Sequence, residues 1–260
     1  MIPLQTFNVD ALSVCVYNSQ EELALAAAQK VQDYLPEVLS QKALAAVLLA
    51  TGNSQIQFLD TLIASQSVDW SRLTLFHLDE FLGINADSAA SFRYYLQSRL
   101  EKRIHPHQFH YIQGDALEPL AECDHYTQLL MAQAIDLCCL GIGKNGHLAF
   151  NEPNVANFDD PYRVKLVKLA QETRLSQVKQ GHFPALEFVP QYAFTVTLPM
   201  LSSARKILCL APGLSKAPIV KRILTDAISP TCPASSLRKH PNTILLLDRD
   251  SASLLISTGL

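Results

Sequence analysis

Residues 135–141 read IDLCCLG, and the glycine-rich stretch IGKNGH follows directly at 142–147. An almost continuous apolar run that ends at glycine is typical of a strand buried on both faces. Similar apolar runs occur at residues 12–17, 46–51, 73–78, 109–112, 193–198, 206–213 and 243–248. We therefore expect a sheet whose strands are covered on both sides.

Longer segments with helical patterns separate these runs, at residues 21–35, 56–65, 91–100, 124–134 and 215–228. Buried strands that alternate with helices are the pattern of a doubly wound α/β fold, in which a mainly parallel sheet lies between two helical layers. We predict this Rossmann-like, three-layer α/β class. No repeat or linker interrupts residues 1–260, so we expect a single domain.

The stretch from about 154 to 190 departs from this alternation, being polar and without a regular pattern. Long irregular segments in compact domains often serve as lids over a site. We expect either a lid or an ordinary surface loop here.

The charge and hydropathy of the chain exclude several classes of partner. A net charge of −3 and a pI near 6.2 leave no broad basic surface, which argues against nucleic acid. The N-terminus lacks a charged leader followed by a long apolar stretch, and the chain has no run of 18 apolar residues. We therefore expect a cytoplasmic protein without membrane insertion, whose ligand is a small molecule.

Cysteine and histidine usage gives no sign of a metal site. The six cysteines show no CxxC spacing, and Cys138 and Cys139 would point to opposite faces of one strand. The histidine-rich segment IHPHQFH at 104–110 contains a proline and has no nearby acidic ligand, so we interpret it as a surface connection. We expect no disulfide, no metal and no organic cofactor.

Polar segments follow four of the apolar runs, where the carboxyl ends of parallel strands would meet. They are LATGNS at 49–54, HLDEF at 77–81, GIGKNGH at 141–147 and APGLSK at 211–216. Ligands of open parallel sheets bind beyond these strand ends. We expect the functional site there.

Two of these segments could cradle a phosphate. Thr51, Gly52, Asn53 and Ser54 stand before an expected helix, where free N–H groups and hydroxyls bind anions. An ordinary helix cap is the alternative. Lys216 lies in the first turn of a later helix, where a cation is unfavourable unless an anion sits in front of it.

HLDEF ends an apolar strand with two successive carboxylates, Asp79 and Glu80. A carboxylate at the edge of a cleft can act as a general base. The two side chains would face different ways, so we expect at most one of them to meet a substrate. The alternatives are a pair of solvated acids, or an acid that caps the following turn.

The segment GIGKNGH also spells GxGxxG, but LAFNEPN follows it and Pro153 blocks an early helix, which excludes a dinucleotide fingerprint. His147 and Glu152 instead lie five residues apart, with Asn145 before the histidine. A carboxylate that orients an imidazole gives a proton shuttle. A histidine satisfied within the core is the alternative.

With these segments together, the sequence resembles the superfamily of glucosamine-6-phosphate deaminases and 6-phosphogluconolactonases, in its deaminase branch. The resemblance spans most of the chain, and GHLAFNEP at 146–153 is its most specific part. It is carried in order by LATGNS, LDEFLGI, SFRYYL, GIGKNGHLAFNEP, GLSKA and CPASSLRKHPN.

This resemblance implies conversion of glucosamine 6-phosphate to fructose 6-phosphate and ammonia. It implies that Asp79 moves the proton between C1 and C2, and that His147 assists opening of the pyranose ring. Glu152 and Asn145 would tune and orient that histidine. Thr51 to Ser54 and Lys216 fall on the family's phosphate contacts, in agreement with the helix-end argument.

The expected lid departs from the family, because EPNVANFDDP replaces the usual serine-rich stretch. A phosphate-binding arginine of the family aligns best with Lys179, and Arg174 is a second candidate. Arg163 and Lys165 resemble positions that bind N-acetylglucosamine 6-phosphate in regulated relatives.

Two other functions stay open from the sequence. In lactone hydrolysis, His147 would activate water and no base at C2 would be needed. A sensor that kept the sugar-phosphate pocket without turnover is the third reading. The sequence leaves open the preferred epimer and whether the protein forms a homo-oligomer.

Overall fold

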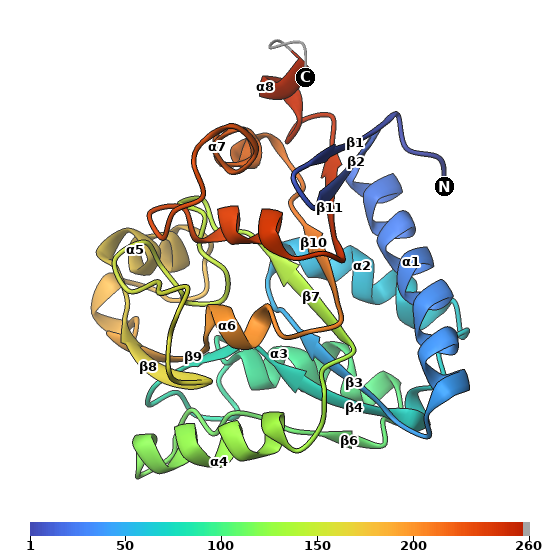
Figure 1. Ribbon diagram of the computed structural model, residues 1–260. Coiled ribbons are helices and arrows are strands. Elements are labelled where there is room, and N and C mark those ends of the chain that lie inside the picture. The colour runs from blue at the N-terminus through green and yellow to red at the C-terminus, as the bar shows by residue number, and fades with distance from the viewer. Residues whose placement is uncertain (257–260) are drawn as a thin grey trace.

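An eight-stranded, mainly parallel sheet forms the centre of the protein, which we describe from a computed structural model for residues 1–256 (Figure 1). The strands follow the order β1 (Gln5–Val9), β2 (Leu12–Tyr17), β11 (Thr243–Asp248), β10 (Lys206–Leu210), β7 (Leu137–Gly141), β3 (Ala45–Leu49), β4 (Leu73–His77) and β6 (Gln108–Phe109). The β1–β2 pair is antiparallel, and the pairs from β2 to β6 are parallel. The predicted fold class is confirmed.

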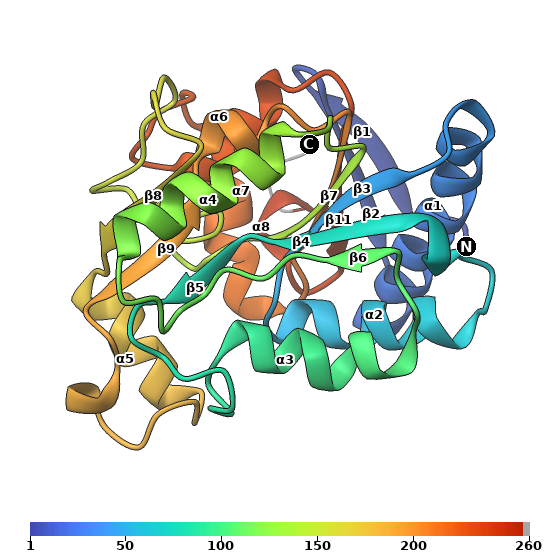
Figure 2. The same ribbon diagram turned by 90° about the horizontal axis from the view of Figure 1, so that it is seen from below.

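Helices cover both faces of this sheet, as Figure 2 shows for α2 and α3 on one side and α4 and α6 on the other. The first layer consists of α1 (Gln20–Gln41), α2 (Asn53–Ala64) and α3 (Phe92–Arg99), which share one apolar core with the sheet. The second layer contains α4 (Pro119–Met131), α6 (Leu198–Leu201), α7 (Ala217–Thr225) and α8 (Ser253–Ile256), which share the other core.

A second, three-stranded sheet lies beside the second helical layer. It is antiparallel, in the order β5 (Asp79–Phe81), β9 (Tyr192–Val196) and β8 (Val164–Lys168). The placement of residues 193–198 in the main parallel sheet was therefore wrong. Phe194 and Val196 of β9 are fully buried against the main core, so the run is as apolar as a central parallel strand.

The expected lid segment contains ordered structure. Strand β8 lies within it, followed by α5 (Gln171–Lys179) and a 3₁₀ turn, η3 (Leu186–Phe188). The expectation of an irregular stretch was wrong. Helix α5 has a weak apolar stripe, since Thr173 is its one buried residue, and apolar periodicity is the signal that identifies helices in sequence.

The path of the chain creates a switch point between β3 and β7. From β3 the chain moves to β4 and β6 on one side, and then returns to place β7 on the other side of β3. Helix α2 follows β3 in the first helical layer, whereas the chain after β7 leads to Val164 in the core of the other face. Connections that diverge in this way open a crevice at the carboxyl ends of the two strands. This crevice is where the sequence places its polar segments.

Asp136 anchors the opposite end of β7. It is fully buried, and its carboxylate accepts hydrogen bonds from Lys42 and from the Ala46 N–H at 2.8 Å. We expect Asp136→Ala to lower the free energy of unfolding by about 3 kcal/mol, because a buried backbone donor and a cation lose their partner. Urea denaturation measures this. Asp33→Ala, an exposed acid on α1, is the control, and equal effects of both substitutions would contradict the assignment.

The six cysteines are free and buried. Cys138 belongs to the core of one face of the sheet and Cys139 to the core of the other, which confirms the predicted alternation. Burial raises the pKa of the Cys139 thiol to about 12. Within residues 1–256, no helix is both long and apolar enough to cross a membrane.

Candidate functional site

A cavity of about 610 Å³ opens at the switch point of the main sheet. The segments after β3, β4, β7 and β10 all contribute to its lining, and so does helix α5. The four polar segments therefore meet at one place, as the parallel topology predicts.

One side of the cavity is formed by two glycine turns that lead into helices. Gly52, with φ of 95°, precedes α2, and Gly213, with φ of 91°, precedes the short turn before α7. Both φ angles favour glycine, because a Cβ would be strained there. Thr51, Asn53 and Ser54 line the cavity beside them.

Lys216 provides positive charge on this side. Its ammonium donates to the carbonyl of Ile142 at 2.5 Å and lines the cavity together with the exposed Lys144. Burial, and secondly the charge of Lys144, lower the pKa of Lys216. A bound anion between these groups would favour the charged form of Lys216 and raise its pKa.

Asp79 reaches the cavity from the first position of β5. Its backbone pairs with that of Thr195 in β9, and it is 7% exposed. Burial, and secondly the neighbouring carboxylate of Glu80, raise the pKa of Asp79 well above its ordinary value. A carboxylate with a raised pKa at the wall of a cavity has the properties of a general base.

Glu80 points away from the cavity, as the alternation of a strand requires. Its carboxylate accepts the N–H groups of Phe92 and Arg93 at the start of α3. Of the alternatives left open by the sequence, the acid that caps the following turn applies to Glu80, and the exposed pair of acids is excluded.

His147 lies across a tight turn from Gly143. The Gly143 N–H donates to the His147 carbonyl at 2.9 Å, and the imidazole stacks on the glycine, where a Cβ would lie 2.2 Å from Nε2. The side chain is 23% exposed and lines the cavity. Burial, and secondly Lys216, lower the pKa of His147 to about 4, so the ring is uncharged near neutral pH.

Two residues that the sequence assigns to His147 lie on different sides of it. The Asn145 side-chain oxygen accepts the backbone N–H of His147 at 3.1 Å, so it shapes the turn, and Asn145 also lines the cavity. Glu152 is fully buried behind the ring, with 3.9 Å between Oε1 and the histidine Nδ1. This distance is longer than a hydrogen bond.

Glu152 is held in place by the first turn of α5. Its carboxylate accepts the Ala170 N–H at 2.6 Å and the Thr173 hydroxyl. The buried Nδ1 of His147 has no hydrogen-bond partner among the described residues. The carboxylate therefore joins the start of α5 to the histidine turn.

Helix α5 presents neutral and acidic groups to the cavity. Glu172 and Ser176 of the helix, and Gln180 directly after its end, line the cavity at a spacing of four residues, which corresponds to one helical face. Lys179 is exposed and is not part of this lining. Arg174 also points elsewhere, since its guanidinium donates to the carbonyls of Leu186 and Val189 at 2.8 Å.

Sequence reasoning missed several lining residues, among them Phe92, Gln177 and His182. His182 and Gln177 are hydrogen-bonded to each other at 2.7 Å. The four-residue polar spacing in α5 could have identified its inner face, had the segment been recognised as a helix. Phe92 belongs to SFRYYL, where nothing in the residue type indicates a cavity.

Lys165, one of the two positions compared with those of regulated relatives, is occupied by internal contacts. Lys165 donates to the Val155 carbonyl at 3.0 Å and to the Asp160 carboxylate. Its charge is therefore already neutralised within the segment that leads to β8. Within residues 1–256, no group of three or more His, Cys, Asp or Glu side chains could hold a metal ion.

Comparison with known sequences agrees with these features. Residues 18–245 match the sequence model of the family described as glucosamine-6-phosphate isomerases/6-phosphogluconolactonase. A glucosamine-6-phosphate deaminase of Bacillus thuringiensis (strain Al Hakam) is 32% identical over 243 residues, 94% of this chain and 89% of that protein. A deaminase of the same name from Bacillus anthracis (strain CDC 684 / NRRL 3495) has the same identity and coverage.

Comparison with solved structures gives the same fold. A structure described as a monomeric glucosamine-6-phosphate deaminase has a TM-score of 0.85 and 32% identity, covering 93% of this chain and 99% of its own. A 6-phosphogluconolactonase from Thermotoga maritima has a TM-score of 0.74 over 90% of this chain and 99% of its own. At 20% identity, the latter likeness shows the fold alone.

Proposed function

Since this chain belongs to the family of glucosamine-6-phosphate isomerases and 6-phosphogluconolactonases, we propose that it converts glucosamine 6-phosphate to fructose 6-phosphate and ammonia. The similar proteins named as glucosamine-6-phosphate deaminases support this choice within the family. The observation that carries the proposal is that Asp79 and His147 line one cavity together with Lys216 and the two glycine turns.

The reaction needs two proton-transfer groups acting in sequence. The hydrogen on C2 becomes acidic only when C1 is a carbonyl, so the pyranose ring must open first. We assign ring opening to His147, whose uncharged ring can accept the proton of the C1 hydroxyl and return it to the ring oxygen.

Asp79 then removes the C2 proton as the general base. The resulting enolamine is protonated at C1, which leaves an imine at C2. Addition of water to C2 and loss of ammonia give the ketose, so one water is consumed for each ammonia released. The raised pKa of Asp79 suits a group that takes up and returns a proton.

We assign the phosphate to the side lined by Thr51, Gly52, Asn53, Ser54 and Lys216. Helix-start N–H groups, hydroxyls and one ammonium are the ligands that a phosphate prefers. Lys179 does not belong to this assignment, because it lies outside the cavity lining. Asn145 and Glu152 act through the histidine turn, one on the backbone and the other behind the ring.

The proposal is tested by measuring ammonia and fructose 6-phosphate from purified protein with glucosamine 6-phosphate, galactosamine 6-phosphate and 6-phosphogluconolactone. A second measurement follows deuterium from solvent, which a base acting at C2 would introduce into the substrate or product. Hydrolysis of the lactone without ammonia release would favour the lactonase alternative. Tight binding without any turnover would favour a sensor.

Lys216→Met should weaken substrate binding more than it slows the chemistry. We expect KM for glucosamine 6-phosphate to rise about 10- to 100-fold with a smaller change in kcat, because a charge-assisted contact to phosphate is lost. Steady-state kinetics measure this split, and Lys179→Met is the matched control outside the cavity. Equal KM values for the two variants would contradict the assignment of the phosphate side.

The location of the protein and its assembly state also belong with this proposal. A cytoplasmic location, expected from the sequence, suits an enzyme of phosphorylated amino sugars. A homo-oligomer also stays a prediction, and the similar deaminase described as monomeric shows that the fold does not require one. Light scattering of the purified protein measures the assembly state.

A further inference from the structure

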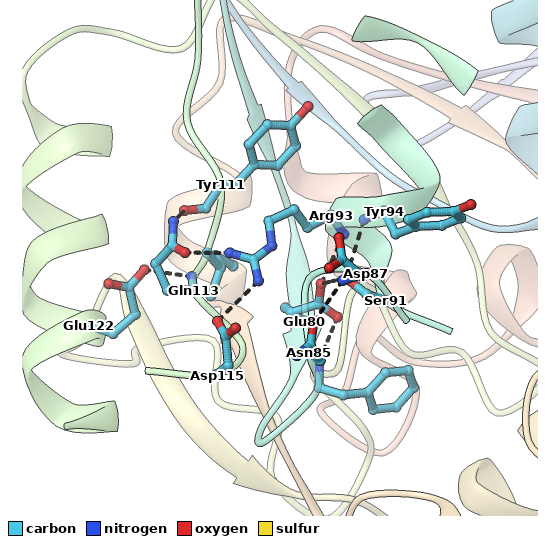
Figure 3. A network of polar contacts seen from close by, with 12 residues as sticks. Glu80, Asn85, Asp87, Ser91, Arg93, Tyr94, Tyr111, Gln113, Asp115 and Glu122 are labelled. Carbon is cyan, nitrogen blue, oxygen red and sulfur yellow. Dashed lines mark hydrogen bonds and ion pairs between the residues drawn. The ribbon is translucent and has the colours of Figure 1, made fainter. Parts of the chain in front are cut away.

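Glu80 is a buried carboxylate that has no part in the chemistry proposed above. It is fully buried. It accepts hydrogen bonds from four donors: the Phe81 N–H at 2.9 Å, the Ser91 hydroxyl at 2.7 Å, the Phe92 N–H at 3.1 Å and the Arg93 N–H at 2.9 Å. Three of these donors stand at the start of α3, so the carboxylate joins β5 to that helix (Figure 3).

Further contacts hold the other end of this connection. The Arg93 guanidinium donates to the side-chain oxygen of Gln113 and to Asp115 at 3.0 Å, and the Gln113 N–H donates to Glu122 of α4 at 2.9 Å. Figure 3 shows these groups converging from α3, α4 and the loop between them. Gly114 packs so closely on β5 that a Cβ there would lie 2.8 Å from the Phe81 carbonyl oxygen.

Two residues that line the cavity, Asp79 and Phe92, are held in place by this network. Asp79 directly precedes Glu80 in β5, and Phe92 gives its N–H to the Glu80 carboxylate. The Phe92 ring lies 5.0 Å from Phe81 and 5.8 Å from Phe150, measured between centroids. A shift of the Glu80 carboxylate would therefore displace the base and a neighbouring wall together.

We propose that Glu80 is a positioning residue for Asp79, which fixes the strand that carries this base and keeps a negative charge beside it. The inference rests on the proposed function, because it takes Asp79 as the base of the reaction. Four donors on one carboxylate define its place more narrowly than a single bond does. A general base must lie within hydrogen-bonding reach of the proton that it removes.

Burial raises the pKa of Glu80, whereas the hydrogen bonds from Arg93, Ser91, Phe92 and Phe81 lower it, so these donors favour the charged form of the carboxylate. Burial, and secondly Glu80, raise the pKa of Asp79. The Arg93 guanidinium is paired with Asp115. Burial keeps His77 of β4 and Tyr126 of α4, which both interact with Asp79, uncharged at neutral pH. Lys144 and Lys216 also line the cavity that Asp79 faces.

Two substitutions separate position from charge. Glu80→Gln keeps the shape of the side chain but removes its charge. The NH₂ group of glutamine replaces one carboxylate oxygen and cannot accept the hydrogen bonds that this oxygen receives. Glu80→Asp keeps the charge but shortens the side chain. We expect kcat for ammonia release to fall about 10- to 100-fold in both, since a displacement of about 1 Å at a reacting group has effects of this size. KM should stay within about twofold.

The dependence of kcat on pH distinguishes the two variants. Without the Glu80 charge the pKa of Asp79 falls, so the decline of kcat at acidic pH should move to lower pH in Glu80→Gln. It should stay in place in Glu80→Asp. Asp87→Asn, which removes an exposed acid from the same loop, is the control and should leave kcat and its pH dependence unchanged.

Carbon-13 NMR of the aspartate carboxyls tests the coupling without turnover. The Asp79 signal is assigned by its loss in Asp79→Asn, and its titration should move to lower pH in Glu80→Gln. If the unaltered protein released no ammonia, the proposed function would fail, and this titration would still test the influence of Glu80. An unmoved Asp79 titration overturns the charge effect, and unchanged kcat in Glu80→Asp overturns the positioning role.

Discussion

Asp79→Asn should reduce ammonia release from glucosamine 6-phosphate by about a thousandfold, the contribution of a well-placed general base. Asparagine has nearly the same shape as aspartate but cannot take up the C2 proton. Exchange of deuterium into C2 should fall by the same factor, whereas KM should change little. Ammonia and mass-spectrometric assays on the same samples measure both rates.

The same substitution should stabilise the folded protein at neutral pH. The folded-state pKa of Asp79 is raised by burial and by Glu80, so folding favours its protonated form. Ionisation of the carboxyl therefore costs stability as pH rises toward and through the folded pKa. This cost is absent below the ordinary pKa of an aspartate, about 3.9.

Thermal unfolding at several pH values checks this consequence. The melting temperature of Asp79→Asn should exceed that of the unaltered protein at neutral pH, and the difference should vanish at acidic pH. An inactive variant that is also less stable at neutral pH would indicate that the substitution disrupted the fold. Asp87→Asn, in the exposed loop, controls for the loss of a negative charge.

Gly143→Ala should nearly abolish the assistance that His147 gives to ring opening. A methyl group at this position would lie 2.2 Å from Nε2, 2.3 Å from Cε1 and 2.4 Å from Cδ2 of the imidazole. The ring must therefore leave its place over the glycine. We expect kcat to fall about a hundredfold, because a displaced proton-transfer group loses most of its effect.

A double-mutant cycle identifies the cause of this loss. In the background of His147→Ala, the added methyl group has no ring to displace, so Gly143→Ala should have no further effect on kcat. A crystal structure of Gly143→Ala should show the imidazole in a new position. Independent, multiplying losses would instead show that the glycine matters for another reason, such as the shape of the turn.

The main sheet was predictable because its strands are buried on both faces. The runs at 12–17 and 243–248 agree with β2 and β11 at both ends. The same signal misled at 193–198, because β9 is equally buried although it belongs to the antiparallel sheet. Burial determines how apolar a strand is, whereas its partner depends on contacts far apart in the sequence.

The parts of the site that depend on strand ends were also predictable. Parallel topology brings Asp79, Asn53 and His147 to one edge of the sheet, and residue types indicate what they can do there. The role of Glu80 stayed open, because a solvated acid and a helix cap have the same residue type. The α3 residues that surround it decide between these alternatives.

The segment expected to form a lid was the least predictable part of the site. Helix α5 faces the cavity rather than an apolar core, so its inner face carries Ser176 and Gln177 and lacks apolar periodicity. The 3.9 Å gap between Glu152 and His147 likewise depends on Thr173 and Ala170, which hold the carboxylate. Ala170, Thr173 and His147 could all donate to this carboxylate, and the tertiary structure decides which of them do.

The adjacent thiols of β7 supply a probe of how each layer of the protein opens. Cys138 is sealed by the helices on one side of the sheet and Cys139 by those on the other. A thiol reagent can modify either one only when the layer above it separates. With the other cysteines replaced, labelling rates at these two neighbours would report the opening free energies of the two layers separately.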